Sequence, residues 1–102
     1  MKRLFISQPM NGKTDEEILA ARKRAIEIAV RCIGEPVEVI DSFFRSAPHE
    51  AKPLWFLAES LKLLSTADVA YFAPGWESAR GCRIENRCAV EYGIAVIEDC
   101  QR

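Results

Sequence analysis

Residues 68–75 are Asp68-Val69-Ala70-Tyr71-Phe72-Ala73-Pro74-Gly75, and this stretch decides the fold. An unbroken apolar run that is closed by Pro-Gly predicts a short buried strand, because proline removes a backbone donor and glycine permits a tight turn. The run Leu4-Phe5-Ile6, which ends at Gln8-Pro9, has the same form. Two further short apolar runs, 37–41 and 94–97, complete a set of four expected strands.

Amphipathic helices are expected between these strands. Thr14-Asp15-Glu16-Glu17 fits a capping box, and apolar residues then recur at three- and four-residue steps as far as Gly34, which suits a left-handed helix cap. A second helix is predicted to begin at Pro53, and a third to run from about Arg80 to Tyr92.

The resulting order β-α-β-α-β-α-β predicts an α/β fold with a parallel sheet, since strands that alternate with crossover helices run in one direction. We expect residues 1–102 to form a single small flavodoxin-like (Rossmann-like) domain. It would be a three-layer sandwich with strand order 2-1-3-4 and helices on both faces of the sheet. Because so small a sheet has edges that need covering, we also expect a homo-oligomer.

Composition excludes several classes of function. Fourteen Lys and Arg against 15 Asp and Glu give a formal charge of −1, which offers no electrostatic reason to bind a nucleic acid polymer. No stretch approaches the roughly 18–20 apolar residues of a membrane span, and the first residues do not resemble a signal peptide, so a cytoplasmic location is expected. The four cysteines form no Cys-x-x-Cys pair and the chain has one histidine, so we expect reduced thiols, no metal and no cofactor.

A ligand site is expected beyond the carboxyl ends of the strands, where the strand order reverses. Three segments follow those ends: 7–13, 41–45 and 74–81. The last one leads into a helix N-terminus, where free backbone amides favour an anion. Ser78, Arg80 and Gly81 could bind such an anion there, and Arg45 could approach it from the second segment.

Glu85 follows within about one helical turn, and we expect its carboxylate to be held ionised, as a nucleophile requires. A simpler interpretation of the same residues stays open, with Ser78 as an N-cap and Glu85 as a surface residue. Likewise, Asn11-Gly12 could form a solvated turn rather than a ligand contact.

Three segments resemble the nucleoside 2-deoxyribosyltransferase superfamily, which includes the 2′-deoxynucleoside 5′-monophosphate N-glycosidases, and most of all a short bacterial and phage branch of it. They are Leu4-Phe5-Ile6-Ser7-Gln8-Pro9, the strand 67–72, and the run from Gly75-Trp76 through Ser78, Gly81, Glu85 and Ala89 to Tyr92-Gly93. The third segment is the specific one, because a Gly stands four residues before the Glu and an Ala four residues after it.

The resemblance implies that Glu85 is a nucleophile that attacks C1′ of a deoxyribosyl unit and forms a covalent intermediate, as in a retaining glycosidase. It also implies that Ser78 binds the 5′-phosphate and that Ser7, Gln8 and Asn11 contact the sugar and phosphate. Trp76 lies in the same loop as Ser78 and is a candidate to stack on the base.

Two positions depart from the superfamily's pattern. Phe5 stands where the superfamily usually has a tyrosine, and Ser60, next to Glu59, stands where it usually has an aspartate that helps protonate or position the base. A residue of a neighbouring subunit could compensate, which would make the active site shared. Within the chain, the candidates to supply or position the proton are Glu59, Ser60, Tyr71, Glu77 and Tyr92.

These observations favour an enzyme that cleaves or transfers the N-glycosidic bond of a 2′-deoxyribonucleoside or its 5′-monophosphate. A non-catalytic nucleotide-binding module with the same cleft is the alternative. A flavodoxin- or receiver-like function is weaker, because a receiver needs acidic residues after its first strand and this chain has Gln8-Pro9 there. In either leading case the partner is a small nucleoside or nucleotide, with no membrane or polymeric nucleic acid involved.

Overall fold

A computed structural model describes residues 1–42 and 49–99 of the chain. The elements in chain order are β1 (Lys2–Ser7), α1 (Asp15–Ile33), β2 (Val37–Val39), α2 (Pro53–Leu64), β3 (Val69–Phe72), the short 3-10 helix η1 (Trp76–Ser78), α3 (Arg80–Glu91) and β4 (Ala95–Glu98). This order confirms the predicted alternation of strands and helices. The second strand is shorter than expected, because its pairing with β1 stops at Val39 rather than Asp41.

The four strands form one parallel sheet in the order β2-β1-β3-β4, as predicted. The chain moves from β1 outward to β2 and then crosses back to place β3 on the other side of β1. The strand order therefore reverses between β1 and β3, where Ser7 pairs with Phe72 at the carboxyl end of both strands. In an open parallel sheet this edge is where ligands bind.

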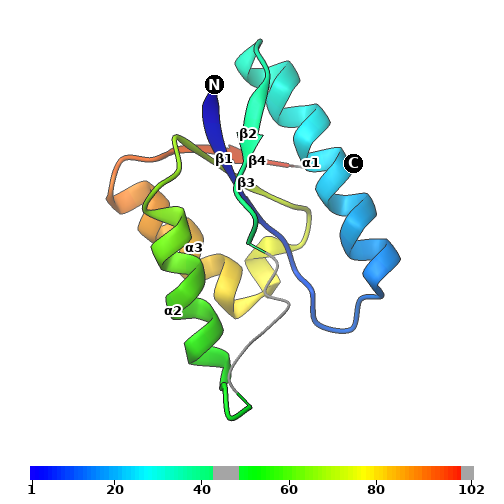
Figure 1. Cartoon of the computed structure of the whole chain (residues 1–102), viewed down its shortest axis with the longest axis vertical. Coiled ribbons are helices and arrows are strands. Elements are labelled where there is room, and N and C mark those ends of the chain that lie inside the picture. The colour runs from blue at the N-terminus through cyan, green and yellow to red at the C-terminus, as the bar shows by residue number, and fades with distance from the viewer. Residues whose placement is uncertain (43–48, 100–102) are drawn as a thin grey trace.

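Helices cover both faces of the sheet, which confirms the three-layer α/β architecture (Figure 1). Leu4, Ile6 and Tyr71 point to the face that packs against α1. Phe5 and Phe72 point to the opposite face, together with apolar residues of α2 and α3. Because neighbouring side chains of a strand point to opposite faces, Ser7 lies on the same face as Phe5, toward α2 and α3.

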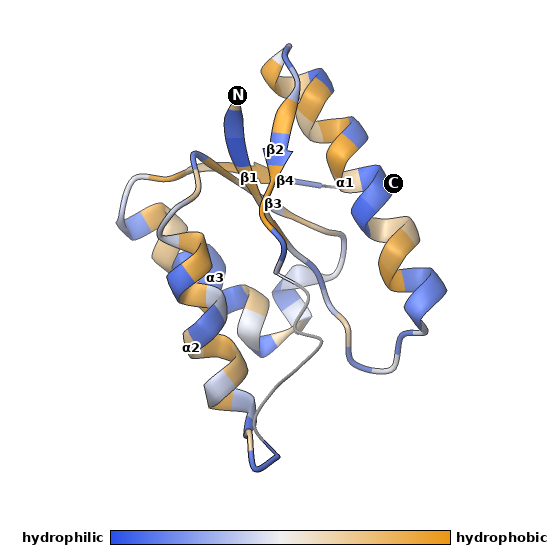
Figure 2. Ribbon diagram, in the orientation of Figure 1, coloured by the Kyte–Doolittle hydropathy of each residue, from blue (hydrophilic) through white to orange (hydrophobic). Residues whose placement is uncertain are grey.

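The ends of α1 are set by local sequence, as expected. The Thr14 hydroxyl accepts a hydrogen bond from the Glu17 amide at 3.1 Å, and Glu17 accepts one from the Thr14 amide at 3.2 Å, which completes the capping box. Gly34 closes the helix with a φ of 81°, a conformation that residues with a Cβ rarely adopt. Between these ends hydrophobic and hydrophilic residues alternate along the helix, as an amphipathic element requires (Figure 2).

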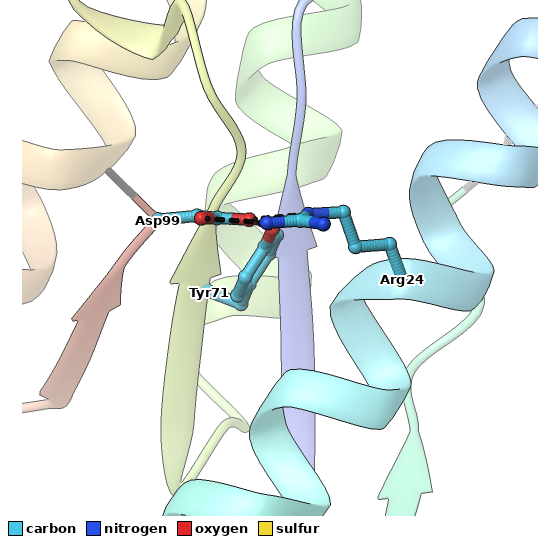
Figure 3. Close-up of polar contacts among 3 residues, drawn as sticks. All are labelled: Arg24, Tyr71 and Asp99. Atoms are coloured by element: carbon cyan, nitrogen blue, oxygen red, sulfur yellow. Dashed lines mark hydrogen bonds and ion pairs between the residues drawn. The ribbon is translucent and has the colours of Figure 1, made fainter. Parts of the chain in front are cut away.

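An ion pair between a half-exposed arginine and an enclosed aspartate ties α1 to the end of β4 (Figure 3). Asp99, directly after β4, accepts hydrogen bonds from Arg24 of α1, with Nε to Oδ2 at 2.9 Å, and from the hydroxyl of Tyr71 on β3. The Arg24 guanidinium lowers the pKa of Asp99, whereas burial, followed by the Asp99 carboxylate, raises the pKa of Tyr71. These contacts join three elements that are distant in sequence.

In the part of the chain described, no helix combines the length and apolar character needed to cross a membrane.

Candidate functional site

A cleft of about 660 Å³ opens at the carboxyl end of β1, between the tip of the sheet, α2 and α3. Its wall includes Phe5 and Ser7 of β1, Ser60 of α2, and Cys82 and Glu85 of α3. The cleft therefore lies where the reversal of strand order predicts a ligand site. Its volume suits a small molecule.

Among the described residues of this wall Glu85 is the acidic one, and its carboxylate is almost wholly enclosed. The residue is 8% exposed, although it lies on a helix with an open outer face. The Ser7 hydroxyl donates a hydrogen bond to Oε1 of Glu85 at 2.7 Å. Ser60 of α2 also lies close enough to this carboxyl group to lower its pKa. The alternative placement of Glu85 as an ordinary surface residue is thus wrong.

The pKa of Glu85 is shifted in the direction opposite to the sequence-based expectation. Burial raises the pKa of the Glu85 carboxyl, and the hydrogen bond from Ser7 and the nearby Ser60 oppose that rise without cancelling it. The physical reason is its position: Glu85 is the sixth residue of α3, beyond the first turn in which a helix N-terminus stabilises a negative charge. Burial is therefore the largest influence on the pKa of this carboxyl group, and it opposes the ionised form that the sequence predicts.

Cys82 is a residue of the cleft that sequence reasoning missed. It stands three positions before Glu85 on α3, so both side chains lie on one face of the helix. Its thiol is buried, and burial is the main cause of its raised pKa; the neighbouring Ser7 lowers the pKa and the nearby Glu85 raises it. The i,i+3 spacing from Glu85 is the signal that could have identified it.

A second hollow, of about 550 Å³, lies at the N-terminus of α3. It gathers four of the residues expected to bind phosphate: Asn11, Ser78, Arg80 and Gly81. Arg80 and Gly81 also line the main cleft, so the two hollows adjoin. The N-cap of α3 is Ala79, which supplies no side-chain hydrogen bond, and the prediction of Ser78 as N-cap is wrong. The first amides of the helix are therefore not satisfied by a capping side chain.

Gln8 occupies the boundary between the cleft and α1. Its Nε2 donates a hydrogen bond to the Ile18 carbonyl at 3.1 Å, and the residue is 6% exposed. Its Oε1 is buried without a hydrogen-bond partner in the structure. Gln8 therefore anchors the end of β1 to the first turns of α1, and it also lines the main cleft as expected.

Three residues proposed as acids lie away from Glu85. Tyr71 points to the α1 face of the sheet, opposite to Glu85, and its hydroxyl is bonded to Asp99. Glu59 turns outward and pairs with Lys62, with Oε2 to Nζ at 2.8 Å. Tyr92 is 84% exposed at the far end of α3. Neighbours on a helix are rotated by about 100°, which brings Ser60, rather than Glu59, into the cleft.

Trp76 is not among the residues that line the cleft, so its position does not support the prediction that it stacks on a base. Its ring packs on Phe72 with a centroid separation of 5.6 Å, as part of the core between the sheet and α3. Gly75, with a φ of 87°, turns the chain just before Trp76. Glu77, another candidate acid, is exposed on η1. Arg45 lies outside the described residues.

The remaining wall of the cleft is largely apolar. Met10, Leu54, Phe56 and Ile84 contribute side chains that are also partly exposed at its mouth. Lys52 and Arg80 supply positive charge to the lining. Among residues 1–42 and 49–99, no three His, Cys, Asp or Glu side chains gather as metal ligands would.

The fold defines a small parallel α/β protein of Rossmann-like form, with an enclosed glutamate at the switch point of the sheet. No family model, curated protein or solved structure matches the chain in comparisons of its sequence and fold.

Proposed function

We propose that the protein cleaves or transfers the N-glycosidic bond of a 2′-deoxyribonucleoside 5′-monophosphate, with Glu85 as the nucleophile. The observation that carries the proposal is the enclosed Glu85 carboxylate, held by Ser7 at 2.7 Å in a cleft that adjoins an uncapped helix N-terminus. The resemblance of the sequence to the deoxyribosyltransferase superfamily supports the same reaction.

The proposed chemistry has two steps. An oxygen of the Glu85 carboxylate attacks C1′ of the deoxyribosyl unit, and the base departs with the electron pair of the broken C1′–N bond and takes up a proton. Water then attacks C1′, releases the carboxylate and gives up a proton, so the products are the free base and deoxyribose 5-phosphate. If a second base attacks instead of water, the reaction is a transfer.

The hollow at the start of α3 supports a nucleotide rather than a nucleoside. Asn11, Ser78 and Arg80 surround this hollow, and the amides of the helix N-terminus stand beside them. Backbone amides, a hydroxyl and a guanidinium are groups that bind phosphate. Because the hollow adjoins the cleft that holds Glu85, one ligand could place its phosphate there and its sugar beside the carboxylate.

A non-catalytic nucleotide-binding module is the second candidate. Retaining glycosidases use two carboxyl groups, and among the described residues that line the cleft Glu85 is the carboxyl group present. Ser60, which lines the cleft, stands where the resemblance implies an aspartate that acts as the second carboxyl group. This arrangement suits binding as well as it suits catalysis.

Release of free base separates the two functions. A panel of deoxynucleosides and their 5′-monophosphates is incubated with the protein, and free base is separated by chromatography while binding is measured by calorimetry. We expect base release from a 5′-monophosphate, its loss in Glu85→Gln, and its retention in Glu91→Gln, which lies exposed on the same helix and pairs with Arg87. Binding without base release in the parent would favour the module, and release that persists in Glu85→Gln would refute the proposed nucleophile.

A further inference from the structure

We propose that Ser7 is a positioning residue for Glu85, whose hydroxyl fixes the plane of the carboxylate and so the direction in which its oxygens face the cleft. This assignment differs from the contact with sugar or phosphate that the sequence predicts for Ser7. The contact between Ser7 and Glu85 lies within this chain and can be tested without a substrate. Only the expected effect on kcat rests on the proposed function.

The contact between Ser7 and Glu85 is enclosed and short. Ser7 is 2% exposed and Glu85 8%, and the distance from Oγ to Oε1 is 2.7 Å. A serine hydroxyl has a single proton to donate, and here that proton is directed at the carboxylate. Hydrogen bonds to a charged acceptor are about twice as strong as those between neutral groups. The Ser7 hydroxyl is therefore already committed before a ligand arrives.

The backbone that carries Ser7 is held on both sides. The Ser7 carbonyl accepts a hydrogen bond from the Ala73 amide at 2.9 Å, which fixes the end of β1 against the end of β3. The next residue, Gln8, is bonded through its side chain to the Ile18 carbonyl of α1 at 3.1 Å. The hydroxyl thus projects from a rigid support, which is what an orienting contact requires.

Ser60 completes the arrangement from a different element. Ser60 lies beside the same carboxyl group on α2 and lowers its pKa, whereas Ser7 is hydrogen-bonded to it from β1 and Glu85 itself stands on α3. A carboxylate has about four acceptor positions, so the bond from Ser7 still leaves acceptor positions for a ligand. The contact from β1 is the more deeply buried of the two.

The test is a measurement of the Glu85 pKa that needs no substrate. The parent, Ser7→Ala and Ser60→Ala are labelled with ¹³C at the glutamate side-chain carboxyl, Glu85→Gln assigns the signal, and each protein is titrated by NMR. Ser7 and Ser60 both lower the pKa of Glu85, so each alanine variant is expected to titrate at higher pH than the parent. The matched control is Ser42→Ala, a buried serine of the same cleft that is bonded to Arg22 at 3.3 Å, and its Glu85 is expected to titrate as in the parent.

If Ser7→Ala folds and its Glu85 titrates at the same pH as in the parent, the proposal is overturned. It is also overturned if Ser42→Ala shifts the Glu85 titration as much as Ser7→Ala does. If Ser7→Ala does not fold, Ser7→Cys replaces it, since a thiol fills similar space and is a weak donor. An upward shift in Ser7→Cys supports the proposal and a parental midpoint refutes it.

The kinetic consequence is measured on the base-releasing reaction. In Ser7→Ala we expect kcat to fall by roughly 10- to 100-fold with little change in KM, and the acid limb of the pH profile to move to higher pH. A change confined to KM would instead make Ser7 a substrate contact. If the parent releases no base, the proposed function fails, while the NMR titration still decides the role of Ser7.

Discussion

Replacement of Glu85 by glutamine is expected to stabilise the protein while it abolishes base release. The folded state raises the pKa of Glu85 above the ordinary value of 4.5, so the folded protein binds this proton more tightly than the unfolded chain does. The free energy of unfolding of the parent must then fall as the pH rises from 4.5 through the raised folded-state pKa, and it stays lowered above it. Glutamine has nearly the same shape and carries no charge, so the variant escapes this loss.

The structure sets the size of the effect. A buried polar group that loses part of its hydrogen bonding costs about 1–3 kcal/mol, and more if it is charged. Glu85 keeps a donor in Ser7, has Ser60 beside it and retains 8% exposure, which places the expected gain near the lower end of that range. We expect about 1 kcal/mol at about pH 8, which corresponds to roughly 4–8 °C in Tm for a chain of this size.

Urea denaturation of the parent, Glu85→Gln and Glu91→Gln at about pH 4, 6 and 8 tests this expectation. The stability gain of Glu85→Gln over the parent should grow with pH, and Glu91→Gln should show no such growth because its side chain is exposed. A Glu85→Gln protein that is no more stable than the parent at about pH 8, or a gain that does not shrink toward about pH 4, would refute the reasoning.

Four substitutions test the placement of residues outside the contact between Ser7 and Glu85. Tyr71→Phe should lower the free energy of unfolding by about 1–2 kcal/mol in urea, since Asp99 loses a donor. Because the pKa of Asp99 lies below its ordinary 3.8, this loss should be full above pH 3.8 and fade as the pH falls through the folded-state value. Trp76→Ala should lower the free energy of unfolding by about 2–3 kcal/mol and leave nucleotide affinity in calorimetry unchanged. Weaker affinity with parental stability would instead show that Trp76 contacts the nucleotide. Glu59→Gln should keep the parental rate of base release, whereas Ser60→Ala should slow it, and the reverse order would make Glu59 the residue that acts.

The elements of the fold follow from short-range sequence signals. Thr14, Glu17 and Gly34 set the ends of α1 through contacts within a few residues, so they could be recognised in the sequence without knowledge of the fold. The alternation of apolar runs with amphipathic segments determined the parallel sheet and both helical layers. It also placed the cleft, because the reversal of strand order follows from the connections.

Within the site, the sequence identified Glu85 and its immediate surroundings but assigned several neighbours wrongly. Tyr71 and Ser7 stand at the ends of adjacent strands, and only the packed structure shows that they face opposite layers. Trp76 lies in the loop that leads to α3, but its ring packs in the core. A loop side chain can point to either side at little local cost, so tertiary packing decides between them.

The amino-acid sequence by itself determined the order of the elements, the edge of the sheet that carries the cleft and the identity of the glutamate within it. The burial of that glutamate and its bond to Ser7 became visible only in the packed structure. Ser7, Ser60 and Glu85 lie far apart in the chain, and the burial that raises the pKa of Glu85 comes from β1, α2 and α3 together. Desolvation depends on everything that surrounds a charge, whereas the helix dipole that the sequence reveals depends on one helix alone.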